Sequence, residues 1–90
     1  MMYIVSFTSE AQKTLSKVKK SNSKLWKKVE KVLHEMADNP KIGTGHPEPL
    51  KGGRSITYSR RISAHDRIIY DVYDDRLAVL VIKLEGHYDD

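Results

Sequence analysis

The amino-acid sequence predicts an α+β fold, in which a helical hairpin packs on one face of a twisted, mainly antiparallel sheet in the order β-α-α-β-β-β. Three observations predict it. Residues 3–7 (YIVSF) are β-branched and aromatic, residues 9–38 carry two apolar stripes at helical spacing, and from residue 54 onward the period becomes that of strands. The 90 residues are expected to form a single domain, 1–90, because they suffice for one modest core but not for two.

Two helices are expected in the N-terminal half. Thr8 and Ser9 offer an N-terminal cap, and Ser9 and Gln12 have capping-box spacing. The first helix should end near Lys20, and Ser21-Asn22-Ser23 breaks the chain before the second. That second helix should stop at Asn39-Pro40, because proline disfavours helical backbone in the residue before it. The apolar positions of the two stripes are Ala11, Leu15 and Val18, then Leu25, Val29, Val32, Leu33 and Met36.

Three strands are expected in the C-terminal half, at residues 54–62, 67–73 and 77–84, with a turn at 74–76. In the first of them alternation places Ser59 and Arg61 on a polar face and Arg60 on the apolar face. We interpret Arg60 as structural, paired with Asp71 or Asp66. The last strand (LAVLVIKL) is almost continuously apolar, which is typical of the interior of a sheet. The helices would cover one sheet face and leave the other for a ligand.

Between the helices and the first of these strands lies a shaped loop, His46-Pro47-Glu48-Pro49-Leu50-Lys51, with glycines on both sides. Proline fixes φ and glycine permits conformations that other residues avoid, so the segment is neither a helix nor a central strand. A rigid turn with a solvated glutamate is the simpler interpretation. A functional role for Glu48 depends on what the rest of the chain brings to it.

The charge distribution differs between the two halves. Residues 1–42 have a net charge of +5 and residues 43–90 a net charge of −1, which gives +4 for the chain. The lysines lie mainly in the first half, largely opposite the apolar stripes, and all the arginines lie in the second. Lysine suits long-range attraction, whereas the guanidinium fork of arginine grips phosphate or carboxylate. The lysine face is a candidate RNA-docking surface, with plain solubility as the alternative.

Several protein classes are disfavoured by what the sequence lacks. No apolar run approaches the roughly 18 residues of a membrane helix, and the N-terminus has no signal-peptide layout. Without cysteine the chain has no disulfide or thiolate nucleophile. We therefore expect a cytoplasmic protein with no membrane partner. Nucleotide-binding glycine motifs and zinc-ligand spacings are also missing, so neither a cofactor nor a metal site is expected.

What remains is one loop carboxylate, Glu48, one late histidine, His87, and several arginines between them. RNA cleavage by its own 2′-hydroxyl needs a base, cations that stabilise the phosphorane, and an acid for the leaving 5′-oxygen. It needs no metal-activated water, because the nucleophile belongs to the substrate. Tyr88 could stack on a base at the scissile step. On the residues alone, a helix-sheet binding module remains the alternative.

Four stretches of the second half resemble the YoeB/Txe family of bacterial toxins, which belongs to the RelE/ParE superfamily of toxin-antitoxin systems. They are GTGHPEPLK (43–51), YSRRI (58–62), HDRIIYDV (65–72) and GHY (86–88). The order and spacing are consistent over nearly the whole second half. The first half matches only in general character, as a strand followed by a helical hairpin.

This resemblance implies a RelE-like toxin that cleaves messenger RNA in the ribosomal A site and is neutralised by a YefM/Axe-type antitoxin. It implies that Glu48 is the general base, that Arg67 stabilises the transition state and that His87 is the general acid. By the same match Lys51 and Arg61 contact phosphate. Tyr88 lies near the reacting nucleotide, and the products are a 5′-hydroxyl fragment and a 2′,3′-cyclic or 3′-phosphate.

The sequence is also compatible with two other functions and with more than one oligomeric state. A ParE-like gyrase-inhibiting toxin and a non-catalytic module that binds RNA or a partner are the alternative functions, and a homodimer is one option for the oligomeric state. Two features depart from the family pattern: Asp89 and Asp90 follow the His-Tyr pair, and the connection 51–54 is short. The geometric expectation is that Glu48, Arg67 and His87 converge on one concave surface.

Overall fold

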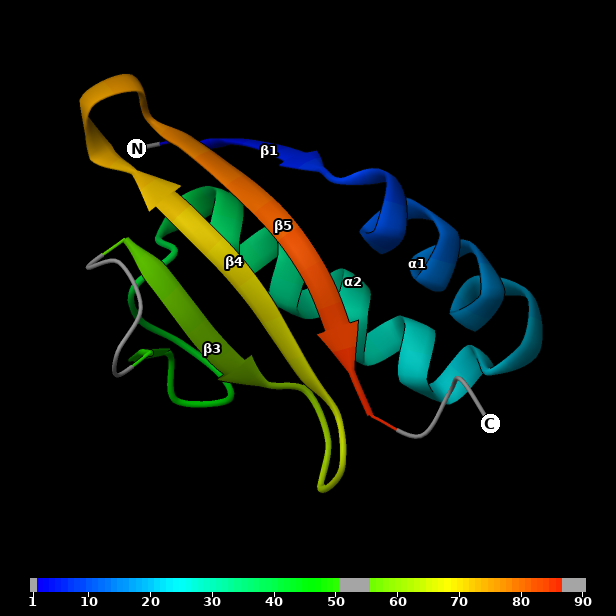
Figure 1. Ribbon diagram of the computed structural model, residues 1–90. Coiled ribbons are helices and arrows are strands. Elements are labelled where there is room, and N and C mark those ends of the chain that lie inside the picture. Colours follow the sequence, from blue (N-terminus) through cyan, green and yellow to red (C-terminus); the bar gives the residue numbers. More distant parts are fainter. Residues whose placement is uncertain (1, 51–55, 87–90) are drawn as a thin grey trace.

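The computed structural model describes residues 2–50 and 56–86, in which two helices lie against one face of a five-stranded sheet (Figure 1). The predicted helices and long strands are all present, with ends that differ from expectation by three residues or fewer. In chain order the elements are β1 (Ile4–Phe7), α1 (Ser9–Ser21), α2 (Ser23–Asp38), β2 (Glu48–Pro49), β3 (Thr57–Arg61), β4 (Arg67–Tyr73), the 3₁₀ turn η1 (Asp74–Arg76) and β5 (Ala78–Glu85).

The sheet is mixed, with strand order β1-β5-β4-β3-β2. β1 runs parallel to β5, and every other neighbouring pair is antiparallel. The α+β class and the mainly antiparallel sheet are therefore confirmed. β5 lies between β1 and β4, which explains its apolar run, because a strand with neighbours on both edges and a covered face is largely removed from water.

The core lies between the helices and the sheet. The apolar stripes of α1 and α2 meet alternate residues of β4 and β5, and Tyr58 of β3 stacks on Tyr70 of β4 with ring centroids 5.9 Å apart. Each fully buried aliphatic side chain contributes about 1.5–3 kcal/mol. Trp26 is half-buried at the edge of this core, as expected, with the Lys19 ammonium 5.6 Å from its ring. No helix in residues 2–50 and 56–86 is long and apolar enough to cross a membrane.

The first helix is capped one residue earlier than the capping-box spacing predicted. Thr8, not Ser9, is the N-cap of α1, and its hydroxyl accepts a hydrogen bond from the Ala11 N–H at 3.1 Å. The same hydroxyl donates to the Ile82 C=O at 2.6 Å, which ties the start of α1 to β5. That second partner comes from the far end of the sequence, so local spacing could not favour Thr8 over Ser9.

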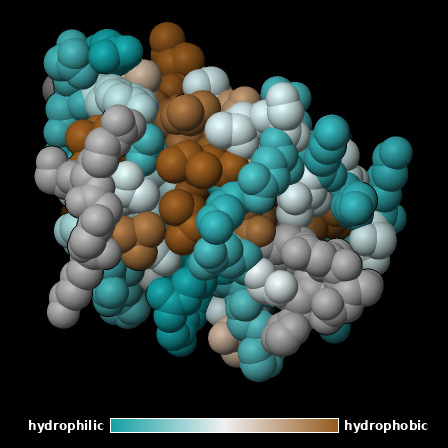
Figure 2. All heavy atoms as spheres, viewed as in Figure 1, coloured by the Kyte–Doolittle hydropathy of each residue, from teal (hydrophilic) through white to brown (hydrophobic). Residues whose placement is uncertain are grey.

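The predicted element order lacked one strand. β2 contains two residues only, and it forms the outer edge of the sheet next to β3. Prolines on either side of Glu48 remove backbone donors, which is tolerated at an edge strand. The helices lie behind the sheet in Figure 1, so the face toward the reader is the uncovered one, and hydrophobic side chains gather in a band over its middle (Figure 2).

Candidate active site

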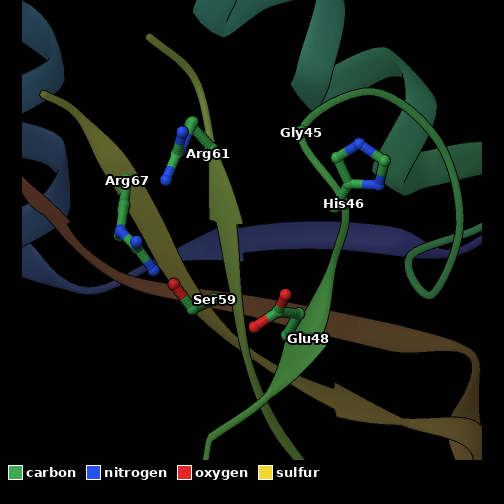
Figure 3. Close-up of a pocket in the computed structure, with 6 residues that line it drawn as sticks. All are labelled: Gly45, His46, Glu48, Ser59, Arg61 and Arg67. Atoms are coloured by element: carbon green, nitrogen blue, oxygen red, sulfur yellow. The ribbon is translucent and has the colours of Figure 1, made fainter. Parts of the chain in front are cut away.

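A pocket of about 220 Å³ opens on the uncovered sheet face, where β2, β3 and β4 lie side by side. Glu48 of β2 and Arg67 of β4 approach it from opposite sides, with β3 between them (Figure 3). The full set of lining residues is Gly45, His46, Glu48, Ser59, Arg61 and Arg67. Three residues that the sequence analysis selected therefore lie in one pocket: Glu48, Arg61 and Arg67.

Backbone bonds to β3 on both sides of Glu48 set its position. Glu48 lies opposite Ser59 in the β2–β3 register. Before it, the Gly45 C=O accepts from the Arg61 N–H at 3.0 Å, and after it, the Leu50 N–H donates to the Thr57 C=O at 2.9 Å. In Figure 3 the carboxylate points from the edge strand toward Ser59. Residues 48–50 of the shaped loop thus lie along β3, with Glu48 and Pro49 as an edge strand.

The two arginines are directly opposed residues of β3 and β4, with Arg61 paired to Arg67 in the register. Both side chains are exposed and share the uncovered face with Ser59. Neither forms an ion pair with a carboxylate of the described residues. Because like charges placed directly opposite on a sheet repel each other, this pair favours an anion between or above the two guanidiniums.

Three lining residues, Gly45, His46 and Ser59, were not selected from the sequence as site residues. Ser59 is 5% exposed and lies between the Arg67 and Glu48 side chains in Figure 3. The signal that could have found it was its place beside Arg61 on the polar face of the strand. His46 has a left-handed backbone, with φ of +50°, and its ring is turned away from the two guanidiniums in Figure 3. Sequence offered no signal for that conformation.

Three selected residues, Lys51, His87 and Tyr88, lie outside the described residues. Their convergence on the pocket therefore stays a prediction. β5 ends two residues before His87, at Glu85, whose register partner is Arg67.

Behind the pocket, on the covered face of β3, the structure corrects the expected partner of Arg60. Its guanidinium pairs with Glu35 of α2 at 3.4 Å and not with Asp66 or Asp71. Asp71 is paired with Thr57 in the register, and both belong to the opposite face, which excludes it as a partner. Arg60 has no exposed surface, as its structural interpretation requires.

Two titratable groups near Arg60 have shifted pKa values. Burial raises the pKa of Tyr70 and outweighs the opposing charge of Arg60, so the hydroxyl stays protonated and donates to the Pro40 C=O at 2.6 Å. Burial alone would raise the pKa of the Glu35 carboxyl, but hydrogen bonds from Thr44 and the nearby Arg60 charge outweigh it. The net result is a lowered pKa for Glu35.

The arrangement combines one carboxylate that can accept a proton with two guanidiniums that can bind a phosphate group. A carboxylate acts as a general base when it lies within hydrogen-bond reach of the proton, directly or through a water. Guanidiniums stabilise charge that develops on phosphoryl oxygens. No three His, Cys, Asp or Glu side chains gather as metal ligands in the part of the chain that the structure describes.

Comparison with known proteins places these features in a family. Residues 7–88 match the model of the "YoeB-like toxin of bacterial type II toxin-antitoxin system". Toxin YoeB of Streptomyces coelicolor is 33% identical over 84 residues, which cover 93% of this chain and 98% of that protein. The YoeB dimer of Staphylococcus aureus is 27% identical with a TM-score of 0.82, and a heterotetrameric YoeB–YefM complex from that organism is 27% identical with a TM-score of 0.80. Each alignment covers 98% of this chain and all of the other.

Proposed function

This chain belongs to the YoeB-like toxins of bacterial type II toxin-antitoxin systems, and from that premise we propose that it is a ribosome-dependent endoribonuclease that cuts messenger RNA in the ribosomal A site. The observation that carries the proposal is the placement of Glu48, Arg61 and Arg67 around one pocket. A toxin that only blocks a target by binding would not need a carboxylate opposed to two guanidiniums that no carboxylate of residues 2–50 and 56–86 neutralises.

In the proposed reaction Glu48 removes the proton of the 2′-hydroxyl of the nucleotide at the cut. The 2′-oxygen attacks the adjacent phosphorus, and the bond from phosphorus to the 5′-oxygen breaks. Arg67 and Arg61 bind the non-bridging oxygens, where negative charge increases in the phosphorane. The leaving 5′-oxygen takes a proton from a general acid, which gives a 2′,3′-cyclic phosphate and a 5′-hydroxyl end. Every transferred atom thus comes from the RNA or from a protein side chain.

The general acid and two further contacts are assigned from the sequence resemblance. His87 is proposed as the acid, Tyr88 as the stacking partner of a base, and Lys51 as a third phosphate contact. The end of β5 supports this for the C-terminal pair, since Glu85 lies opposite Arg67 and His87 follows two residues later in the sequence.

A YefM-type antitoxin is the proposed protein partner, on the ground that a relative from Staphylococcus aureus forms a heterotetrameric complex with YefM. A homodimer is the proposed state of the free toxin, because a YoeB dimer is also known from that organism. Occupation of the pocket by the antitoxin would compete with RNA for Arg61 and Arg67.

The test is primer extension on a reporter messenger RNA that is being translated in the presence of the purified protein. We expect cuts that are phased to the reading frame and that disappear when translation initiation is blocked. Glu48→Gln keeps the shape of the side chain but removes the base, so it should slow cleavage by about 10²–10⁴-fold. The matched control is Glu30→Gln, at an exposed carboxylate of α2 remote from the pocket.

Four results would contradict the proposal. Cuts that are not phased to the reading frame would contradict cleavage in the ribosomal A site. Undiminished cleavage by the Glu48→Gln variant would show that Glu48 is not the general base. Induction of a DNA-damage response in cells without RNA cuts would identify a gyrase-inhibiting toxin instead. Cells that are indifferent to expression of the protein would point to a non-catalytic binding module.

A further inference from the structure

A buried cation lies directly behind the candidate active site. Arg60 has no exposed surface, and it follows Ser59 and precedes Arg61, the two residues of β3 that line the pocket. Because side chains alternate along a strand, Arg60 projects from the opposite face. A guanidinium without access to water is costly unless its N–H groups are bonded and its charge is balanced. Its partners therefore show what this residue holds in place.

The guanidinium binds the first half of the segment that joins α2 to β2, residues 39–47. Its Nη2 donates to the Pro40 C=O at 3.1 Å and to the Ile42 C=O at 2.9 Å. Its Nε donates to the Tyr70 hydroxyl at 3.3 Å, and that hydroxyl donates in turn to the Pro40 C=O. Two backbone carbonyls of the segment are thus satisfied by one buried cation and its tyrosine neighbour.

Glu35 of α2 binds the second half of the same segment. Its Oε1 accepts from the Thr44 N–H at 2.7 Å, and its Oε2 accepts from the Thr44 hydroxyl at 2.8 Å. The Oε1 atom is also the one that pairs with the Arg60 Nη1. Gly43 permits this approach, because a Cβ at that position would lie 2.4 Å from the Oε1 atom. The ion pair therefore holds both halves of the segment to α2 and to β3.

The segment leads directly into the pocket wall. Gly45 of this segment lines the pocket and its C=O accepts from the Arg61 N–H, and Glu48 follows three residues later (Figure 3). Pro47 lies between them with its fixed φ, so the direction of the chain at Glu48 depends on where Gly45 is held. We propose that Arg60 and Glu35 are positioning residues that hold Glu48 in line with Arg61 and Arg67.

This inference rests on the proposed role of Glu48 as general base. On one face of β3, Arg61 then binds the anion. On the other face, Arg60 holds residues 39–47, the segment that leads to the proposed general base Glu48. A shift of the segment would move the base relative to the phosphate site without removing any group that touches RNA. The expected signature is a slower chemical step with substrate binding unchanged, since a misplacement of about 1 Å can cost a hundredfold in rate.

The test uses two variants of graded severity and one matched control. Thr44→Val removes the hydroxyl bond to Glu35 at an exposed position and should leave the fold intact. Arg60→Lys keeps the buried charge but loses the fork that reaches both carbonyls. Val18→Ala is the control, because it weakens the core under α1 without touching residues 39–47. Single-turnover and steady-state cleavage are measured on messenger-programmed ribosomes.

For Thr44→Val we expect kcat to fall roughly tenfold while KM changes less than about twofold, with a larger fall in kcat for Arg60→Lys. The control should keep both constants even though it melts earlier. Equal losses in the control and in Thr44→Val would overturn the proposal, because the effect would then come from stability alone. So would a change confined to KM.

A double-mutant cycle tests whether the segment acts through Glu48. In a Glu48→Gln background, Thr44→Val should cost nothing further, because the group that it positions is already absent. A second tenfold loss on top of Glu48→Gln would overturn the inference and leave the proposed function standing.

Amide hydrogen exchange separates the failure of this inference from the failure of the proposed function. The Arg61 N–H reports the bond to Gly45, so it should exchange at least about tenfold faster in both variants than in the parent, relative to the slowest core amides. If the parent protein cuts no RNA, the proposed function is wrong, and exchange still shows whether the segment is held by Arg60 and Glu35. Unchanged Arg61 exchange in both variants would refute the positioning role.

Discussion

Arg61 and Arg67 lie on directly opposed residues of β3 and β4, with both guanidiniums on the uncovered face. In the free protein this pair costs stability, because neither charge meets a carboxylate of the described residues within ion-pair distance. When a phosphate is bound, both guanidiniums are attracted to the same anion, and this attraction offsets their mutual repulsion. At this site, therefore, the features that favour binding are expected to oppose folding.

Replacing Arg61 by glutamine should show this opposition. Arg61→Gln is expected to stabilise the free protein by roughly 0.2–0.5 kcal/mol, the low end for a cross-strand pair because water screens exposed charges. The same change should weaken RNA binding and reduce the slope of log affinity against log salt by about 0.7 for single-stranded RNA. Chemical denaturation and titrations at several salt concentrations measure the two effects.

Arg61→Lys is the matched control for that experiment, since it keeps the like-charge pair and should gain no stability. If the glutamine variant were less stable than the lysine variant, repulsion across β3 and β4 would not be the controlling term. An unchanged salt slope in the glutamine variant would show that Arg61 does not contact phosphate.

At the scale of elements, the close approach of residues 45–50 to β3 depends on one glycine. Gly45 has φ of +86°, and a Cβ at this position would lie 1.9 Å from the Arg61 carbonyl oxygen. Gly45→Ala must therefore push the segment away from β3, and we expect a loss of about 1–3 kcal/mol in the free energy of unfolding together with most of the cleavage activity.

Ile42→Ala provides the comparison for Gly45→Ala. Ile42 lies three residues before Gly45 and is 63% exposed, so the substitution should change neither quantity appreciably. Thermal unfolding and the rate of RNA cleavage are measured for both variants. Full cleavage activity in Gly45→Ala would show that RNA cleavage does not depend on the close packing of residues 45–50 against β3.

Sequence patterns predicted the elements that bury a regular face. The strand at 67–73 matches β4 at both ends, because alternate residues such as Ile68 and Tyr70 enter the core. β2 escaped prediction because a strand of two residues, Glu48 and Pro49, has no period. Its place comes from bonds that β3 supplies, through Thr57 and Arg61. The period of apolar residues reports which side chains are buried. It does not report an edge strand whose position depends on hydrogen bonds to residues distant in sequence.

The candidate site divides in the same way. Alternation in β3 placed Arg61 on a polar face, and resemblance to a known family selected Glu48 and Arg67, which the structure brings together. The wrong partner for Arg60 shows the limit of local reasoning: a carboxylate on a helix 25 residues earlier can neutralise a strand residue once the fold is complete. The left-handed backbone of His46 likewise depends on contacts that its neighbours in sequence do not specify.

At the scale of the whole molecule, lysines and the pocket are found on different layers. The helical lysines are exposed, and the helices cover the sheet face opposite to the pocket. Charges at such a distance attract RNA but do not touch the reacting phosphate. Replacing Lys24, Lys27 and Lys28 together by glutamine should raise the KM for programmed ribosomes several-fold, more at low salt, and leave kcat within about twofold.

The control for the lysine variant keeps its charge: the same three positions are changed to arginine, which should preserve KM. Steady-state cleavage at two salt concentrations measures the effect. A fall in kcat without a change in KM would show that the helical face takes part in the chemical step. Unaltered constants would support the simpler interpretation that these lysines serve solubility.

The pH dependence of stability should report a cluster that joins distant parts of the chain. Asp74 of η1 accepts from the Tyr3 hydroxyl at 2.8 Å and pairs with the Lys41 ammonium, so it links the residue before β1, the segment after α2 and the turn before β5. The hydrogen bonds from Lys41 and Tyr3 lower the pKa of Asp74, and the bond to Asp74 raises the pKa of Lys41.

A carboxyl with a lowered folded-state pKa contributes stability above its unfolded value of about 3.9, and this contribution disappears as the pH falls through the folded pKa. A lysine with a raised pKa contributes below about 10.4 and loses the contribution as the pH rises through the folded pKa. The difference in thermal midpoint between the parent and Asp74→Asn should therefore be constant from about pH 5 to 9 and shrink on both sides. The control is Asp75→Asn: among the described residues Asp75 pairs with Arg76 at 3.6 Å and with no other cation, so this variant should match the parent throughout. A difference between the parent and Asp74→Asn that stayed the same at every pH would show that shape, and not charge, holds this cluster together.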